Sequence, residues 1–313
     1  MAKPSDQSLP PGSWDSHVHI VDEEMFPLHP SHPYRPRKAD LHDLMKFEAE
    51  HGISHVCLVA FSVYHDDNSA IAWALEKLNG RGRAVVCINP STVTDEELDW
   101  LHNLGARGVR INLRTRSQQM DQKDFQLLLE QYANRIRSRG WAIQLYVALA
   151  QIEQIASIIT RLGVPVVIDH IGAPDANGGR IQNQPGYKAF MNLLGSGLVW
   201  TKLSGVYRFN ELPDLDEYVV KILRTAPDRV VWASDWPHSG GTEANPNGDR
   251  HAVQDYRQVD DHGWIARCKQ WCEMADGHDG QTLIGKIWRD NPRTLWQFDN
   301  NKRQEVGGST SRL

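Results

Sequence analysis

The sequence predicts a single α/β domain in which eight parallel strands, alternating with helices, close into a barrel. Short apolar runs rich in β-branched residues alternate with longer amphipathic segments, and eight such runs occur along the chain. No glycine-rich dinucleotide fingerprint follows the first run, which weakens the alternative of an open doubly wound sheet. A chain of 313 residues with 40% hydrophobic content is long enough for one barrel and its core.

The expected elements follow one another along the chain. The candidate strands are Trp14 to Val21, His55 to Phe61, Ala84 to Asn89, Gly108 to Leu113, Ala142 to Val147, Pro165 to His170, Val199 to Ser204 and Arg229 to Ser234. Apolar residues recur at spacings of three and four in the expected helices, which include Lys38 to Glu50, Ser69 to Leu78, Asp95 to Leu104, Lys123 to Arg139, Ile152 to Leu162 and Leu215 to Thr225.

Charge and hydropathy narrow the expected partners to small molecules. The formal net charge is -5 and no long Lys/Arg run occurs, so we expect no binding to nucleic acid or to an anionic membrane. No apolar run approaches the roughly 18 to 20 residues that a spanning helix needs, and the N-terminus lacks an apolar signal core. The four cysteines show no paired framework of the secreted kind, so we expect all of them to be reduced.

Polar tails are expected to flank the barrel. Residues 1–13 form a predicted flexible N-terminal tail, residues 14–299 the barrel and residues 300–313 a flexible C-terminal tail. The last three residues, Ser311-Arg312-Leu313, resemble a peroxisomal address of the Ser-Lys-Leu type. We therefore expect a cytoplasmic protein, or a peroxisomal one if the source is eukaryotic. No element carries an interface pattern, so the sequence leaves the oligomeric state open.

Two motifs at the ends of strands carry most of the chemistry. His17 and His19 close the first strand, and side chains two apart in a strand point the same way. Two such imidazoles can bind a metal or polarise a carbonyl, although a purely structural pair is an alternative. Asp235 ends the eighth strand. Because the active site of a closed parallel barrel lies at the C-terminal ends of its strands, we expect these residues to meet there.

The other strands also end in polar residues. Convergence of so many polar side chains on one rim favours an active site over scattered surface polarity. They are Ser62 and Tyr64 after the second strand, Arg110, Arg114 and Arg116 on and after the fourth, Tyr146 on the fifth, Asp169 and His170 on the sixth, Lys202 and Arg208 on and after the seventh, and His238 just beyond Asp235.

These residues lie in motifs that resemble the amidohydrolase superfamily, amidohydrolase family 2, and within it the 2-pyrone-4,6-dicarboxylate lactonase branch. The resemblance covers roughly residues 14 to 298 and implies a distorted (β/α)8 TIM barrel that hydrolyses the ring ester of a small lactone. The motifs are Trp-Asp-Ser-His17-Val-His19, Gly108-Val-Arg110, Ile168-Asp-His170-Ile-Gly, Lys202-Leu-Ser-Gly205, Trp232-Ala-Ser-Asp235-Trp-Pro-His238 and Asp290-Asn-Pro-Arg-Thr-Leu-Trp296.

The resemblance leaves the metal content open between two alternatives. Many superfamily members hold one or two divalent ions through a Lys or Glu on strand four and histidines on strands five and six, besides the strand-one histidines and the strand-eight Asp. Here strand four carries Arg110 and Asn112, and strand five carries Gln144 and Tyr146. The possible metal ligands that remain are His17, His19, His170 and Asp235, and these are enough to bind one zinc ion. The lactonase branch is associated with catalysis without a required metal, so we expect no cofactor, with Zn²⁺ as the alternative.

The expected mechanism divides the work between a carboxylate and three imidazoles. Asp235 is the expected general base that activates water, and it can later protonate the ring oxygen as this oxygen leaves. His17, His19 and His170 are expected to polarise the lactone carbonyl, where negative charge develops in the transition state.

Arginines indicate an anionic substrate, because a guanidinium binds a carboxylate through two parallel contacts. Arg110 and Arg116 match the spacing at which the pyrone dicarboxylate lactonases present two carboxylate-binding arginines, and Arg208 lies where a third is expected. The remaining candidates have supporting roles: Tyr146 and Ser62 would extend the anion site, and His238 would either contact substrate or brace its loop. The segment Ser239 to Gln258 is either a lid or a surface insertion.

Two further hypotheses stay open at this point. One is a zinc-dependent decarboxylase or hydrolase of the same superfamily. The other, of a different class, is a non-catalytic barrel that binds small carboxylates. The sequence does not identify the lactone.

Overall fold

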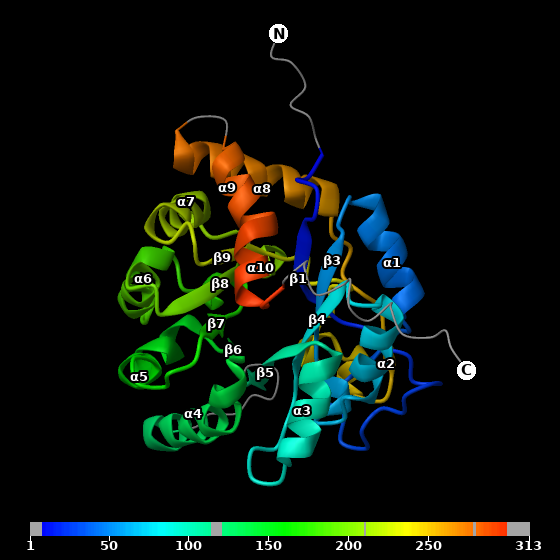
Figure 1. Ribbon diagram of the computed structural model, residues 1–313. Helices are drawn as coiled ribbons and strands as arrows, with labels where there is room; N and C mark the ends of the chain where they lie inside the picture. The colour runs from blue at the N-terminus through cyan, green and yellow to red at the C-terminus, as the bar shows by residue number, and fades with distance from the viewer. Residues whose placement is uncertain (1–7, 114–120, 210, 278–279, 299–313) are drawn as a thin grey trace, which may run out of the picture.

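The barrel is present in the computed structural model, which describes residues 8–113, 121–209, 211–277 and 280–298. Eight parallel strands form one sheet in the order β1-β3-β4-β5-β6-β7-β8-β9 (Figure 1). Their bounds are β1 Trp14–Val18, β3 His55–Val59, β4 Gly82–Val86, β5 Ala106–Asn112, β6 Ala142–Tyr146, β7 Val166–Ile168, β8 Val199–Leu203 and β9 Val230–Trp232. Each overlaps one of the eight candidate strands, so the predicted (β/α)8 barrel is confirmed.

Helices surround the strands on the outside of the barrel (Figure 1). They are α1 Leu41–Glu50, α2 Ser69–Leu78, α3 Asp95–Leu104, α4 Gln122–Ile136, α5 Leu149–Ile159, α6 Tyr187–Gly195, α7 Leu215–Thr225, α8 Asp261–Asp276, α9 Gln281–Gly285 and α10 Asn291–Leu295. Helix α6 and the C-terminal helices α8, α9 and α10 are not among the segments listed from the sequence. None of the described helices is both long and apolar enough to cross a membrane.

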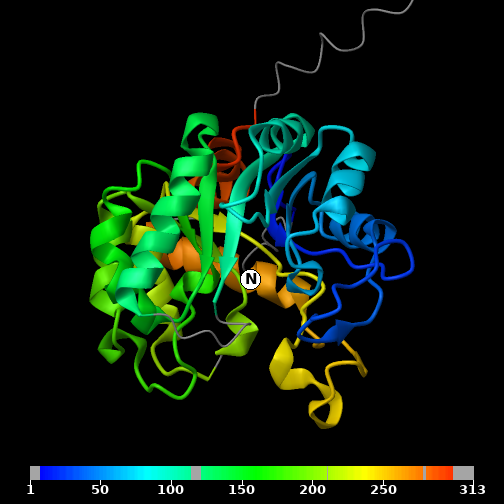
Figure 2. The same ribbon diagram turned by 90° about the horizontal axis from the view of Figure 1, so that it is seen from below.

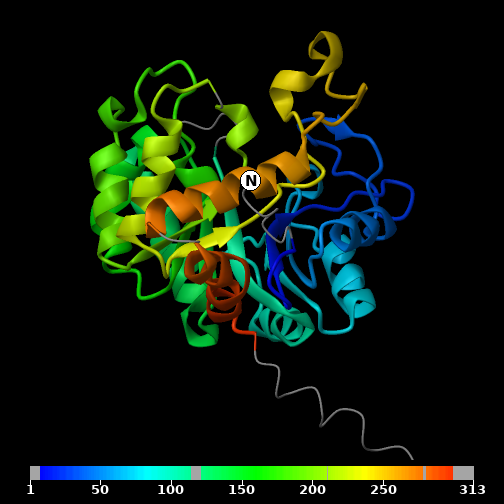
Figure 3. The ribbon, with the colours of Figure 1, turned by 90° about the horizontal axis from the view of Figure 1, so that it is seen from above.

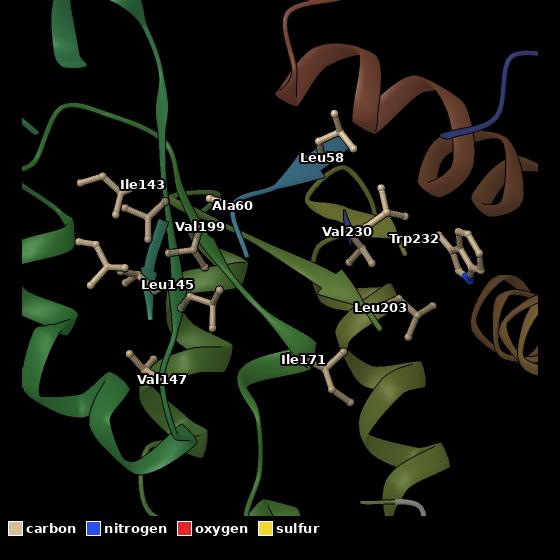
Figure 4. Packing of buried hydrophobic residues seen from close by; sticks show 14 of the residues in the cluster. Leu58, Ala60, Ile143, Leu145, Val147, Ile171, Val199, Leu203, Val230 and Trp232 are labelled. Atoms are coloured by element: carbon tan, nitrogen blue, oxygen red, sulfur yellow. The ribbon is translucent and has the colours of Figure 1, made fainter. Parts of the chain in front are cut away.

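Alternation along each strand divides the apolar side chains into two cores. In β3, Val56 and Leu58 point outward into the layer between strands and helices, part of which Figure 4 shows. Cys57 and Val59 point inward and join Trp296, which follows α10. The polar site therefore lies above an apolar barrel floor.

The first and last strands meet at a seam, by which we mean the contact of β1 with β9 and the residues that follow them. Apart from an isolated bridge between Val18 and Trp236, these strands form no ladder. The backbone N–H of His19 donates to Trp236 O at 2.9 Å, and that of Asp235 donates to His17 O at 3.1 Å. The seam thus places the strand-one histidines beside Asp235.

The segment 239–258 packs against a loop near the N-terminus. Its short strand β10 (Val253–Gln254) pairs in parallel with β2 (Arg35–Pro36). Figures 2 and 3 show this segment, in yellow to orange, projecting at one end of the barrel beside the blue loop that follows β1. Side-chain hydrogen bonds from Asn245 to Pro33 O and from Arg250 to His32 O add to this pairing, and the role of the segment as a lid stays a prediction. The tripeptide 311–313 lies outside the described residues, and the predicted tails stay predictions.

Candidate active site

A cavity of about 400 Å³ opens at the C-terminal ends of the strands. Strand ends supply one part of its wall and the segment 239–258 supplies another. The lining residues include His19, Phe61, Arg110, Tyr146, His170, Arg208 and Asp235 from the strand ends, and Ser239, Gly240, Gly241, Thr242, Glu243 and Arg257 from the segment. The strand ends therefore meet in one cavity, at the rim where a barrel carries its active site.

His17 and His19 are held rigidly at the end of β1. The register of β1 against β3 shifts between Asp15 and Val18, and such irregularities often redirect side chains next to active sites. His17 Nε2 lies 3.1 Å from His19 Nε2, and the His19 ring stacks on Phe61 with centroids 4.6 Å apart. Both imidazoles are buried, so their neighbours decide which ring nitrogen carries the proton.

His170 completes the imidazole group from the end of β7. Its ring stacks on His17 at a centroid distance of 5.2 Å, and its Nδ1 lies 2.8 Å from Ser204 Oγ. Gly205 makes this approach possible, because a Cβ at that position would lie 2.7 Å from His170 Nδ1. The φ angle of +63° at Gly205 also favours glycine.

The two carboxylate oxygens of Asp235 have different neighbours. Oδ2 accepts from Tyr207 Oη at 2.6 Å and from Arg208 Nη2 at 3.1 Å. Oδ1 lies 3.7 Å from His17 Nε2 and 4.0 Å from His19 Nε2. These two distances are too long for direct hydrogen bonds. Asp235 has a φ of +67°, a strained value of the kind that clusters at functional sites.

Electrostatics keep the imidazoles neutral and the carboxylate charged. Burial lowers the pKa of His19 to about 3 and that of His170 to about 4, and it lowers the pKa of His17 well below its ordinary value. Burial alone would raise the pKa of Asp235, but His170 and Arg208 hold that pKa well below its usual range. At neutral pH a carboxylate therefore faces three neutral imidazoles.

Lys202 of β8 reaches this group from below and is fully buried. Its Nζ donates to Gln144 Oε1 at 2.7 Å and lies 3.2 Å from His17 Nδ1 and 3.4 Å from Asp169 Oδ1. Gln144 Nε2 in turn donates to Asp169 Oδ2 at 2.9 Å, which fixes the orientation of the amide. Burial lowers the pKa of Lys202, while the Asp169 carboxylate opposes this change. The Asp169 carboxylate beside Nζ favours the charged ammonium form of Lys202.

These contacts assign a tautomer to both strand-one histidines. An ammonium group cannot accept a hydrogen bond, so His17 Nδ1 accepts and neutral His17 carries its proton on Nε2. His19 Nδ1 lies 2.7 Å from the carbonyl oxygen of Val59, which only accepts. Neutral His19 therefore carries its proton on Nδ1 and has a bare Nε2. His17 Nε2–H donates to that nitrogen.

Arg110 separates the main cavity from a second one of about 360 Å³ and lines both. Its Nη1 donates to Ala60 O at 2.6 Å, and the guanidinium is mostly buried. Ser62 lines the second cavity rather than the first, and its Oγ accepts from Asn112 Nδ2 at 3.0 Å. Arg110 is thus placed to meet an anionic group from either side.

The other predicted substrate contacts lie at different places. Tyr146 lies edge-on to His170 with ring centroids 4.8 Å apart and lines the main cavity. Arg208 also lines it while pairing with Asp235. His238 does not line it; its Nε2 lies 3.1 Å from Asp261 Oδ1 of α8, a contact that braces the loop. Arg116, like Arg114, lies outside the described residues.

Several residues of the site were given no role in the sequence analysis. Lys202 had a usable signal, because a lysine inside an apolar strand is rarely buried without a partner. The hydroxyl of Tyr207 contacts Asp235, but no feature of the sequence pointed to Tyr207 except its position before Arg208. The others are Gln144 and Asp169 below the histidines, and Tyr34 and Arg257 on the cavity wall.

Comparison with known proteins identifies the family. The family model described as amidohydrolase matches residues 14–298. The protein belongs to the amidohydrolase family. This finding confirms the resemblance inferred from the strand-end motifs.

Named relatives share the family and most of the chain. A 4-sulfomuconolactone hydrolase from Hydrogenophaga intermedia is 32% identical over 239 residues, which are 74% of this chain and 77% of the relative. A 2-pyrone-4,6-dicarboxylate hydrolase from Comamonas testosteroni is 29% identical over 302 residues, 92% of this chain and 91% of the relative. The crystal structure of a proposed 2-pyrone-4,6-dicarboxylic acid hydrolase from Pseudomonas putida has a TM-score of 0.74 and 28% identity, covering 93% of this chain and 99% of its own.

Some amidohydrolases of similar fold bind zinc, and one structure from Burkholderia multivorans contains it (15% identity, TM-score 0.64, coverage 92% of this chain and 99% of that one). In the described part of this chain, two groups of ligand atoms lie within 4.8 Å of one another: His17 with His19 and Asp235, and His17 with Asp169 and His170. Proximity alone would allow a metal. The tautomer of His17 does not fit the first group, because its Nε2 carries a proton instead of a lone pair.

Proposed function

We propose that this amidohydrolase hydrolyses the ring ester of a small carboxylated lactone. The observation that carries the proposal is the charged Asp235 carboxylate, whose Oδ1 faces two neutral imidazoles at 3.7 and 4.0 Å. The named relatives, which act on a pyrone dicarboxylate and on a sulfonated muconolactone, support a lactone as substrate class. Arg110 and Arg208 on the cavity wall support an anionic substituent on the ring.

In the proposed first step, Asp235 Oδ1 takes a proton from water while the water oxygen attacks the lactone carbonyl carbon. His19 Nε2 can accept from the same water once His17 Nε2–H has turned away from it. Oδ2 does not take the proton, because the donors of Tyr207 and Arg208 hold it. The carbonyl π bond opens and leaves a tetrahedral oxyanion.

Donors for this oxyanion come from the other two imidazoles. His17 Nε2–H can turn from His19 to the developing charge, and His170 can donate from Nε2 when Ser204 Oγ donates to its Nδ1. Collapse of the oxyanion breaks the bond to the ring oxygen, which takes the proton from Asp235. The product carries a new carboxylic acid group, which releases its remaining proton to solvent at neutral pH, and the base is regenerated.

We propose that this reaction needs no metal. A zinc ligand must present a lone pair, and the contact of His17 Nδ1 with Lys202 leaves the His17 proton on the nitrogen that faces Asp235. No step of the proposed mechanism requires a Lewis acid, because neutral imidazole donors serve the oxyanion.

The test is an assay of purified, chelator-treated enzyme against a panel of lactones, with zinc quantified in the same preparation. The panel contains 2-pyrone-4,6-dicarboxylate, a sulfonated muconolactone and an uncharged lactone of similar size. Rapid ring opening of the anionic lactones at substoichiometric zinc is the expected result. Activity that appears only after zinc is added would contradict the metal-free mechanism. Binding of carboxylates without turnover would replace the enzyme hypothesis with that of a carboxylate-binding barrel.

A further inference from the structure

Lys202 provides the basis for a further inference, because a buried ammonium lies where the metal-binding members of such a barrel need acceptors. Its Nζ contacts residues from three other strand ends: Gln144 on β6, Asp169 after β7 and His17 on β1. The side chain is fully buried, so these contacts are not exchanged for water. Lys202 is thus a fully buried part of the site beneath the histidines.

The hydrogen bond at His17 Nδ1 runs in the opposite direction to the one that supports a metal-ligating histidine. A metal-ligating histidine donates its second N–H to a carboxylate or carbonyl oxygen, which leaves a lone pair for the metal. The carboxylate for that arrangement is present, because Asp169 Oδ1 lies 3.6 Å from His17 Nδ1. Lys202 Nζ contacts both atoms, at 3.4 and 3.2 Å. The ammonium donates to His17 Nδ1 and so displaces Asp169 as its partner.

We infer that Lys202 is a positioning residue that fixes His17 as a hydrogen-bond donor at Nε2 and thereby keeps the group His17, His19 and Asp235 from binding a divalent metal. The ammonium charge adds direct repulsion of a cation. The inference has a catalytic part, that His17 supplies an N–H to the oxyanion, and this part rests on the proposed function. The parts about the His17 tautomer and about metal binding do not depend on the proposed function.

The first measurement needs no variant. The ¹⁵N chemical shifts of the imidazoles in the wild-type protein, assigned by comparison with a His17→Gln variant, report which nitrogen of His17 carries the proton at neutral pH. A proton on Nε2 is expected. A proton on Nδ1 would overturn the inference, whether or not any lysine variant folds.

The second measurement uses Lys202→Met, which keeps the length of the side chain and removes its charge and donors. The His17 proton is expected to move to Nδ1, where Asp169 accepts it, and Nε2 becomes a ligand. Zinc chloride titrated calorimetrically into chelator-treated protein should then bind about one ion per chain, and about 10- to 100-fold or more tightly than to the wild type. Equal zinc affinity in the two proteins would contradict the inference.

Two comparisons separate this effect from a general disturbance. Lys221→Met removes a lysine of the same size from the exposed side of α7 and should leave both the tautomer and the zinc affinity unchanged. Adding Asp169→Ala to Lys202→Met removes the acceptor for the new Nδ1–H and should reverse most of the gain in zinc affinity. An undiminished gain in the double variant would exclude the proposed exchange between Lys202 and Asp169.

Turnover provides a separate readout. Lys202→Met is expected to lower kcat on an anionic lactone by about 10²- to 10³-fold, as loss of one oxyanion donor does, with little change in KM. If the wild type opens no lactone, the proposed function fails, while the tautomer and zinc measurements still decide the role of Lys202.

Discussion

Asp235 can act as a base through only one of its oxygens. Oδ2 accepts from Tyr207 and Arg208, which leaves Oδ1 facing His17 and His19. This division orients the carboxylate without neutralising it. Its pKa stays well below the ordinary value because His170 and Arg208 outweigh the effect of burial.

We expect Asp235→Asn to lower kcat by about 10²- to 10⁴-fold, the usual contribution of a general base, while the Kd for a lactone substrate changes little. Steady-state kinetics and calorimetric binding measure the two quantities. Asp228→Asn is the matched control, because Asp228 lies at the other end of β9 and pairs with Lys286. Retained turnover in Asp235→Asn would remove this residue from its proposed role.

Arg110 is expected to contribute to substrate affinity more than to the chemical step. Loss of a charge-assisted contact in Arg110→Met should raise KM for a dicarboxylated lactone by about 10- to 100-fold and leave KM for an uncharged lactone within about threefold. Arg161→Met, an exposed arginine after α5, serves as control. An equal effect on charged and uncharged lactones would show that Arg110 supports the structure instead of binding an anion.

The residues at the strand ends were predictable, whereas their connections were not. His17, His19, His170 and Asp235 could be placed together because parallel strands bring their C-terminal ends to one rim. The role of Lys202 depends on three side chains from three other strand ends, and no sequence spacing encodes that convergence.

At the scale of elements, regular periodicity explains which parts were predictable. Helices α2, α3 and α7 begin and end at the residues expected from the sequence, because their apolar faces repeat clearly. Helix α6, with nine residues against ten in α2 and α3, was not listed; it follows a long turn-rich segment. Strands β2 and β10 have two residues each, and two residues contain no pattern to detect.

The start of α6 depends on Gly186. It has a φ of +82°, and a Cβ there would lie 1.8 Å from Leu149 O at the start of α5. We expect Gly186→Ala to lower the free energy of unfolding by about 2 to 5 kcal/mol, from left-handed strain and a backbone clash together. Gly179→Ala is the control, since Gly179 has a φ of +68° with open space around it and should cost only about 1 to 2 kcal/mol. Similar costs in urea unfolding would contradict the clash.

At the scale of the whole molecule, a buried carboxyl group makes stability depend on pH. Glu48 of α1 is almost fully buried, and neither of its carboxylate oxygens has a hydrogen-bond partner. Burial, together with the nearby Asp15 and Asp261, raises its pKa well above the ordinary value. The folded protein therefore retains a proton that the unfolded chain releases above its ordinary pKa of about 4.5. By linkage, this group costs stability progressively as the pH rises above that value.

We expect Glu48→Gln to stabilise the protein at pH 8 relative to the wild type, and to do so less at pH 5. Glutamine has no proton to lose, so the difference in free energy of unfolding should grow with pH. Urea unfolding at pH 5, 6.5 and 8 measures it. Glu50→Gln, an exposed position on the same helix, should show no such trend. A difference that does not depend on pH would show that Glu48 does not retain its proton.

Because of the seam, the candidate active site forms only after nearly the whole chain has been synthesised. His17 and His19 belong to the first strand and Asp235 follows the last one, and the two ends meet through only a few backbone contacts. A nascent chain released from the ribosome before residue 235 contains the histidines without the carboxylate that they face in the folded protein. The recovery of turnover during refolding would therefore time the moment when the two ends of the barrel join.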